Sequence, residues 1–251
     1  MTEGRVEHGG YARQTAAQRR SGGGVGRSSR SYWKHDEIES FLRRQLPILS
    51  TIGRGVIIDM HAGDGQEVEH PEPDMFAGGS VKTTAAMTIA YAERYRADAI
   101  LCEKTLESRL PLEAQFGGRA TILSDHRELM GEDTLSGFSN DYAYVFVISD
   151  PNGFATQGEE VMRALSLTQR AVDFAIVVNV RPFVRSLALQ ANDKASVAAR
   201  KSAEGKRWML EADGWTRYLG RKQCLTREGR LSNAMHARLF LVSNVIKGIG
   251  R

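Results

Sequence analysis

The sequence predicts a doubly wound α/β fold: a mostly parallel sheet that ends in an antiparallel strand pair. From Tyr32 onward, short apolar runs alternate with segments of helix length. The runs are rich in Val and Ile and apolar throughout, which is typical of strands buried on both faces of a parallel sheet. Two further runs near the end are separated only by a short loop, as in an antiparallel pair. This order of elements favours helices on both faces of one sheet.

The expected elements begin with a helix at residues 35–49, where Ile38, Phe41, Leu42 and Leu46 share one face. Parallel strands are expected at residues 55–60, 98–103, 119–125, 142–150 and 173–180. Crossover helices are expected between them at residues 81–95, 104–116 and 158–171. Two strands at residues 215–224 and 236–244, joined by a loop around Gly229, are expected to close the sheet.

Composition excludes several classes of protein. No apolar run approaches the ~18 residues of a membrane span, and the N-terminus lacks the apolar core of a secretory signal. The two cysteines, Cys102 and Cys224, lie far apart and form neither a disulfide framework nor a zinc site. We therefore expect a reduced, cytoplasmic protein that is not bound to a membrane.

Charge is divided unevenly along the chain. Residues 1–31 carry six Arg and two Glu, residues 32–180 carry 23 acidic and 13 basic side chains, and residues 181–230 carry five acidic and 12 basic ones. This asymmetry favours a polyanionic partner, DNA or RNA, on one side of the protein. The alternative is a solvated surface with uneven charge; a protein partner and the oligomeric state stay open.

The basic ends of the chain are interpreted separately. Residues 1–31 hold seven glycines and are expected to form a flexible arm that contacts phosphates, or else a linker, ahead of one domain at residues 32–251. Residues 181–230 are expected to face the substrate. Trp208 and Trp215 within them suit stacking on bases, but the favoured interpretation is that they anchor the core.

Acidic residues follow four of the expected strands. Asp59 ends the first, Glu103 the second, Asp125 the third and Asp150 the fourth. Ligands of such sheets bind beyond the carboxyl ends of the strands. One acid in this place is often only a helix cap. Four in strand order indicate a ligand site, because a buried carboxylate needs partners.

The turn after the first strand, "DMHAGDGQEV", contains Gly63 and Gly65. A nicotinamide-dinucleotide enzyme would carry a third glycine where Val68 stands, and an acid about 20 residues further on. The next strand-end acid here is Glu103, much further along the chain. These differences argue against a dinucleotide.

The segments "YWKHDEIESFL" and "IIDMHAGDGQ" resemble the J-type ribosomal-RNA adenine-N6 methyltransferases. The chain is also similar to the three-Cys-motif partner proteins, whose Gly-Ser and Asp-Pro-x-Gly elements are matched by "FAGGSVKTT" and "FVISDPNGF". The resemblance covers roughly residues 32–180. It implies a Rossmann-like, class I methyltransferase that uses S-adenosyl-L-methionine (SAM).

The resemblance also implies a set of cofactor-binding residues. The glycine turn would approach the amino-acid end of SAM, Glu103 would bind the ribose hydroxyls, and Asp125 would meet the adenine amino group. The full set of implied cofactor residues is Lys34, His35, Asp59, His61, Ala62, Gly63, Gly65, Ser80, Glu103 and Asp125. For Lys34, His35 and His61, purely structural roles are the alternative.

At the fourth strand the implied catalytic residues are Asp150, Pro151, Asn152 and Phe154. The Asp150 carboxylate and the Pro151 carbonyl would accept the hydrogens of an exocyclic amine and position it for methyl transfer, without a metal. Phe154 would stack on a flipped base. Asn152 and Gly153 replace the proline and tyrosine of the J-type motif, so a different acceptor or an inactive site is the alternative.

The hypothesis from sequence is a SAM-dependent methyltransferase that acts on an amino nitrogen of a base in nucleic acid. A methyltransferase for a small molecule or a protein is one alternative. A non-catalytic nucleic-acid-binding protein with this fold is the other.

Overall fold

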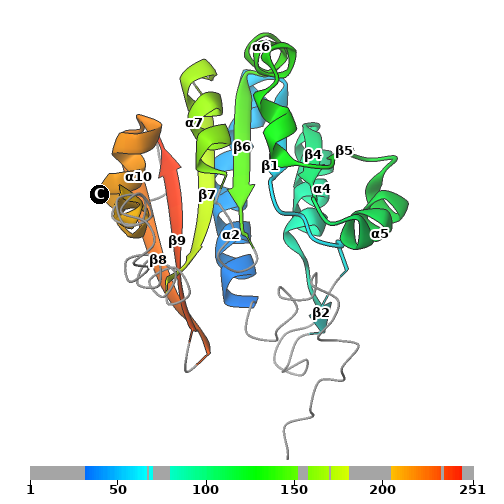
Figure 1. Ribbon diagram of the computed structural model, residues 1–251. Coiled ribbons are helices and arrows are strands. Elements are labelled where there is room, and N and C mark those ends of the chain that lie inside the picture. The colour runs from blue at the N-terminus through cyan, green and yellow to red at the C-terminus, as the bar shows by residue number, and fades with distance from the viewer. Residues whose placement is uncertain are drawn as a thin grey trace, which may run out of the picture.

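The computed structural model describes residues 32–66, 68–69, 80–151, 158–169, 171–180, 205–232 and 235–244. Within them lies a seven-stranded sheet in the order β5-β4-β1-β6-β7-β9-β8 (Figure 1). The parallel strands are β1 (Gly55–Asp59), β4 (Asp98–Cys102), β5 (Thr121–Leu123), β6 (Tyr144–Ser149) and β7 (Val172–Asn179). The antiparallel strands are β8 (Gln223–Ser232) and β9 (Met235–Ser243). The predicted fold class is confirmed.

Helices cover both faces of the sheet, as β1 illustrates: Ile57 packs into one apolar cluster, while Val56 and Ile58 pack into the other. The first cluster contains side chains of α2 (Tyr32–Gln45), η1 (Leu46–Ile48), α3 (Leu49–Ile52), α4 (Thr84–Tyr95) and α5 (Leu106–Phe116). The second contains side chains of η2 (His126–Met130), α6 (Glu132–Asp141), α7 (Glu159–Thr168), η3 (Arg207–Leu210) and α10 (Ala212–Leu219). The strand runs are apolar throughout because both of their faces are buried.

The helix expected at residues 35–49 begins earlier and ends earlier, as α2. Its predicted apolar face is confirmed, since Ile38, Phe41, Leu42 and Leu46 are fully buried. The chain continues into η1, which contains Pro47. The early start carries the N-terminal turn of α2, which contains Lys34, to Asp150 at the carboxyl edge of the sheet.

The prediction of a strand at residues 215–224 is wrong. Helix α10 occupies the first half of that range: Trp215 and Leu219, four residues apart, are both buried, and Gly220 ends the helix at φ 63°. The predicted loop residue Gly229 lies within β8, packed so closely against the ring of Trp33 that a side chain would collide with it. The pattern of β8 was obscured because it is the edge strand and carries charged residues such as Arg227 and Glu228.

Other elements had no counterpart in the prediction: η2, α6, and a small antiparallel pair of β2 (Val68–Glu69) and β3 (Ser80–Val81). Trp215 packs in the core and its indole N–H donates to the Met209 carbonyl oxygen at 2.9 Å, as expected of an anchor.

The proposed arm at residues 1–31, and residues 181–204 of the basic segment, lie outside the described residues. In the ranges that the structure covers, no helix is both long and apolar enough to cross a membrane.

Candidate functional site

The sheet brings the strand-end acids together along one edge. Its strand order places Asp125, Glu103, Asp59 and Asp150 one after another, at the carboxyl ends of β5, β4, β1 and β6. The turn after β1 stays bound to both neighbouring strands: the Met60 N–H donates to the Ile148 oxygen at 2.9 Å, and the Ala62 N–H to the Cys102 oxygen at 3.0 Å. The glycine turn is therefore held in the middle of the acidic edge.

Glycine is favoured at these two positions of the turn for different structural reasons. Both have left-handed backbones, with φ 65° at Gly63 and 70° at Gly65. A Cβ at Gly65 would lie 2.7 Å from Phe116 Cε2 and 3.0 Å from Leu112 Cδ1, so the packing of α5 excludes a side chain there. A Cβ at Gly63 would meet no atom within 4 Å. The space beside Gly63 is open, as a ligand-binding turn requires.

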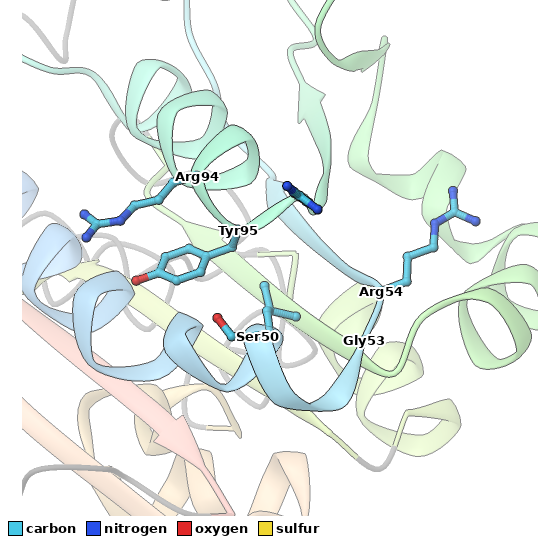
Figure 2. A pocket seen from close by; sticks show the side chains of 7 residues that line it. Ser50, Gly53, Arg54, Arg94 and Tyr95 are labelled. Carbon is cyan, nitrogen blue, oxygen red and sulfur yellow. The ribbon is translucent and has the colours of Figure 1, made fainter.

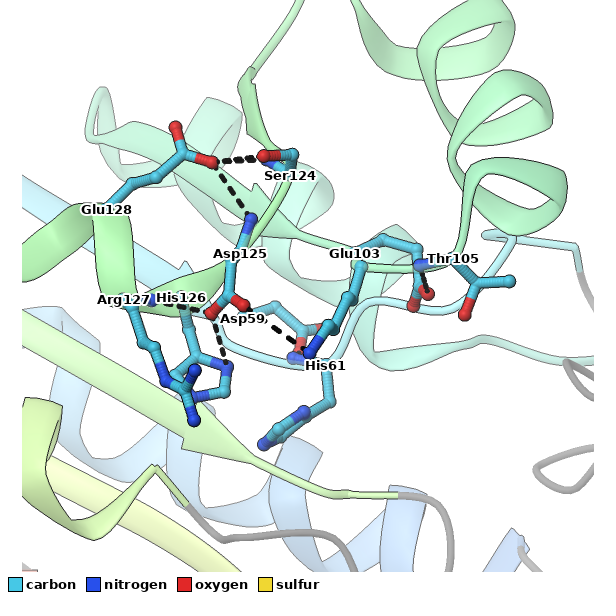
Figure 3. Close-up of polar contacts among 10 residues, drawn as sticks. Asp59, His61, Glu103, Thr105, Ser124, Asp125, His126, Arg127 and Glu128 are labelled. Atoms are coloured by element: carbon cyan, nitrogen blue, oxygen red, sulfur yellow. Dashed lines mark hydrogen bonds and ion pairs between the residues drawn. The ribbon is translucent and has the colours of Figure 1, made fainter.

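Glu103 fastens this turn to β4. Its Oε2 accepts a hydrogen bond from the Gly63 N–H at 3.1 Å, and its Oε1 accepts one from the Thr105 N–H at 2.7 Å (Figure 3). A carboxylate has about four lone-pair sites, so both oxygens can still accept from a ligand.

Asp59 lies fully buried below the turn. Its Oδ1 accepts a hydrogen bond from the His61 N–H at 3.0 Å (Figure 3). Its Oδ2 has no well-aligned hydrogen-bond partner among the described residues. Burial raises the pKa of Asp59 to about 7, although hydrogen bonding from Thr84 and from the His61 N–H opposes the shift. Ala62, which is 4% exposed, belongs to the core.

Asp125 already has a structural role as the N-cap of η2. Its Oδ1 accepts from the Arg127 N–H at 2.9 Å, and Glu128 Oε1 accepts from the Asp125 N–H at 3.0 Å (Figure 3). Burial raises the pKa of Asp125, but the Arg127 N–H and nearby cations outweigh it, so the pKa is lowered. Lys104 Nζ lies 3.9 Å from Oδ2. Of the four acids, this is the one whose position a helix cap explains.

A pair of histidines flanks the edge. The rings of His61 and His126 are 5.2 Å apart in an edge-to-face arrangement. His126 was missed from sequence, where the only signal was its position after a strand-end acid; burial lowers its pKa. Gly158, at φ 69°, approaches so closely that a Cβ there would lie 3.2 Å from His126 Cδ2. The start of α7 is thereby brought against the site.

Lys34 and His35 lie against Asp150 rather than at the glycine turn. Lys34 Nζ is 2.9 Å from Asp150 Oδ1 and 2.6 Å from Oδ2, and both residues are buried. His35 Nε2 lies 3.9 Å from Oδ2, and His35 Nδ1 is buried without a hydrogen-bond partner in the part of the chain described. Burial and the Lys34 charge lower the pKa of His35 to about 4, against the opposing effect of Asp150. Lys34, His35 and Asp150 therefore form a buried polar group at the end of β6.

Of the predicted catalytic residues at the end of β6, the structure describes Asp150 and Pro151. Pro151 is buried, and its carbonyl oxygen accepts a long hydrogen bond, 3.4 Å, from Asn179 Nδ2 at the end of β7. Asn179 was missed because a lone asparagine at a strand end has no distinctive pattern. Asn152 and Phe154 lie outside the described residues, and Ser80 is placed only by its backbone pairing with Glu69.

The edge as a whole suits a cationic ligand. Asp150 and Glu103 both lie near enough to Asp59 to raise its pKa, so carboxylates are concentrated beside the open turn, with Asp150 paired to Lys34. Among the residues described, no three His, Cys, Asp or Glu side chains are grouped as a metal site. The edge therefore combines an open backbone turn, buried carboxylate oxygens and a separate buried acid at β6.

No protein-family model and no curated protein sequence matches the chain. Among solved structures, it is similar to protein LPL1258 from Legionella pneumophila, described by family model DUF519, with 10% identity, 87% of this chain and 86% of that one covered, and a TM-score of 0.50. Two others are the plantazolicin methyltransferase BamL (11% identity, 86% of each chain, TM-score 0.43) and the METTL16 MTase domain (12% identity, 86% of this chain, 82% of that one, TM-score 0.40). The first likeness shows the fold, and methyltransferases are among the structures that share similarity with this chain.

Proposed function

We propose that this protein is a SAM-dependent methyltransferase that modifies an amino nitrogen of a base in nucleic acid. The observation that carries the proposal is the juxtaposition of two features on adjacent strands. One is the open turn at Gly63, fastened by Glu103. The other is the Asp150–Pro151 motif at the end of β6, where hydrogen-bond acceptors follow a buried strand.

The residues around the turn fit SAM. SAM carries an ammonium and a sulfonium, and the buried Asp59 has an oxygen, Oδ2, without a well-aligned partner. Gly63 leaves room for the amino-acid end of the cofactor, and Glu103 keeps lone pairs for ribose hydroxyls. Asp125, the η2 cap, is assigned to the adenine amino group. When bound, the cofactor supplies a methyl group activated by the sulfonium.

The chain's own contribution to the chemistry is to bind and orient the acceptor amine. The Asp150 carboxylate and the Pro151 carbonyl accept its two hydrogens, which directs the nitrogen lone pair and makes the amine a better nucleophile. Lys34 uses part of the hydrogen-bonding capacity of Asp150 and fixes its carboxylate. Positioning of this kind can supply much of a rate enhancement.

Charge supports a nucleic acid as the acceptor. The chain has a net charge of +4 although residues 32–180 are strongly acidic, so the excess of Lys and Arg lies in the N-terminal and C-terminal segments. Basic regions outside an acidic, cation-binding site suit a polyanion that presents one base to that site.

The proposal is tested by transfer of isotope-labelled methyl from SAM to RNA and DNA. Asp150→Asn is expected to slow transfer by about 10²–10³-fold, because an amide cannot accept both from Lys34 and from the amine as a carboxylate does. Its affinity for SAM, measured by calorimetric titration, should stay near that of wild type. Asp133→Asn, on the exposed surface of α6, is the matched control and should leave both quantities unchanged.

Two results would contradict the proposal. A folded wild type that binds no SAM, alone or with nucleic acid, excludes the cofactor assignment. Transfer to a small molecule or a protein that added RNA or DNA does not compete excludes the acceptor class and supports the first alternative.

Alanine substitutions of the two turn glycines should separate stability from cofactor binding. Gly65→Ala is expected to lower the free energy of unfolding by about 2–4 kcal/mol, since overpacking against α5 adds to left-handed strain. Gly63→Ala should lower it by only about 1–2 kcal/mol, since no neighbouring atom is met. Calorimetry should show the greater loss of SAM affinity in Gly63→Ala, measured on folded protein. Equal SAM affinities for Gly63→Ala and wild type would remove the turn from the cofactor site.

A non-catalytic nucleic-acid-binding protein is the second candidate, and the Lys34–Asp150 contact favours it. The ammonium lies within 2.9 Å of both oxygens of the Asp150 carboxylate, which the reaction needs as one of its two acceptors. Nucleic-acid binding with steep salt dependence, and no methyl transfer to any acceptor, would support this candidate.

A further inference from the structure

A pocket lined by arginines lies at the opposite end of the sheet from the acidic edge. It has a volume of about 500 Å³ and sits where α3 leads into β1 and where α4 ends. The residues that matter here are Ser50, Gly53, Arg54, Arg94, Tyr95 and Arg96 (Figure 2). We call this the arginine pocket; no acidic residue lines it.

Two of its three arginines lack an acidic partner. Arg54 is paired with Asp98, with Nη2 2.7 Å from Oδ2, and also lies over the ring of Tyr142. Arg94 and Arg96 form no ion pair with any residue that the structure describes, and Arg94 lies 5.6 Å from the centre of the Tyr95 ring. Glu93, the acid next in sequence, is bound by Arg119. Among the described residues, the positive charge of Arg94 and Arg96 is therefore not compensated by an ion pair.

The backbone of Arg96 is a second, independent sign of function. At φ 55° it is the one non-glycine residue with a positive φ in the described ranges. It ends α4, where its N–H donates to the carbonyl oxygens of Ala92 and Glu93, a position that normally favours glycine. Arg94 already supplies a cation to complement the dipole of the last turn. An arginine held in a disfavoured conformation is explained if its guanidinium binds a ligand.

We propose that the arginine pocket binds phosphates of a nucleic-acid backbone. Figure 2 shows Arg54 and Arg94 extending to different sides of Tyr95 instead of converging on one point. Separated guanidinium groups suit successive phosphates of an extended chain better than one small anion.

The location of the pocket fits a polynucleotide that also reaches the acidic edge. Strand β1 runs from Gly55, next to the pocket, to Asp59 at the site. Five residues of strand span roughly 17 Å, and phosphates of one strand of a duplex recur about every 3.4 Å along its axis. A stem of about five base pairs beside the acceptor base covers that length. The inference shares its nucleic-acid partner with the proposed function but does not require methyl transfer.

The test is a fluorescence-anisotropy titration of a labelled RNA hairpin and a DNA duplex over a range of salt concentrations. The double variant Arg94→Ala/Arg96→Gly should bind several-fold to tenfold more weakly, and the slope of log affinity against log salt should fall by about 1 for each arginine. Arg43→Ala, which removes an exposed arginine already paired with Glu39, is the control and should change both quantities less. Arg96→Gly alone should raise the thermal midpoint while weakening binding, which no general loss of folding would do.

Three further outcomes are distinguishable. Wild-type affinity and salt slope in the double variant would overturn the inference and leave the proposed methyl transfer untouched. Displacement of RNA by millimolar pyrophosphate at constant ionic strength, lost in the double variant, would assign the pocket to a small phosphate and overturn the backbone assignment. The wild type could transfer no methyl group while the arginine variants still bind nucleic acid more weakly than it does. That result would support the inference and contradict the proposed function.

Discussion

Replacing Lys34 by methionine is expected to lower the free energy of unfolding by about 3–5 kcal/mol, because it leaves the buried Asp150 carboxylate without its counter-ion. Lys34 and Asp150 are 4% and 5% exposed, and the ammonium contacts both carboxylate oxygens. His35 is a poor replacement as a cation at neutral pH, because burial, the largest cause of its lowered pKa, remains in this variant and its Nε2 lies 3.9 Å from Asp150 Oδ2. Urea unfolding at pH 7 measures the effect.

The double variant Lys34→Met/Asp150→Leu keeps the prediction testable if the single variant does not fold. It should recover most of the lost stability, because replacing a whole buried ion pair by apolar residues is often neutral or stabilising. Lys104→Met, at a side chain that is 79% exposed, is the matched control and should change stability little. A loss below about 1 kcal/mol in Lys34→Met would place this pair in the range of exposed ion pairs and contradict the buried geometry.

If the double variant is stable but transfers no methyl group, the pair is kept for the reaction and not for the fold. Because this variant also lacks Asp150, a role of Lys34 as a positioning residue that acts through Asp150 is tested with Asp150 in place. Lys34→Arg, which keeps the charge, should restore part of the transfer rate relative to the double variant, with SAM affinity unchanged in both.

The sequence was sufficient for the sheet because its strands repeat one simple pattern. A run such as Val56–Ile58 is apolar throughout since each face of the sheet is covered. The edge strand β8 has no such constraint and lacks this pattern, so the predicted strand overlaps α10, where Trp215 and Leu219 share a buried helical face.

The part of the candidate site that could be predicted from sequence is the set of acidic residues at the ends of the strands. The acids at 59, 103, 125 and 150 are brought to one edge by parallel topology alone. The ion pair of Lys34 with Asp150 joins residues 116 positions apart and depends on where α2 packs, which no local pattern encodes. His126 and Asn179 were missed because a single residue near a strand end has no distinctive local pattern.

Asp59→Asn is expected to stabilise the protein more at pH 8 than at pH 5, by a difference of about 2–3 kcal/mol between the two pH values. The pKa of Asp59 is raised by burial from 3.8 to about 7 in the folded protein. The unfolded chain then ionises this group at lower pH than the folded chain does, so its ionisation favours unfolding. This destabilisation is complete above pH 7 and fades as the pH falls from 7 toward 4. Asparagine does not ionise, so its advantage over aspartate shrinks over that window, which urea unfolding at both pH values measures.

The same carboxylate links cofactor binding to pH. If the ammonium of SAM meets Asp59, it favours the ionised carboxylate, so binding near pH 7 should release a proton from wild type and none from Asp59→Asn. Calorimetric titrations in two buffers of different ionisation enthalpy detect that proton, and Asp133→Asn serves as the exposed control. A pH-independent stability difference would show that Asp59 is not desolvated as its burial implies. A normal pH dependence without proton release would place the ammonium elsewhere along the acidic edge, with Asp59 then supporting the turn through its hydrogen bond to the His61 N–H.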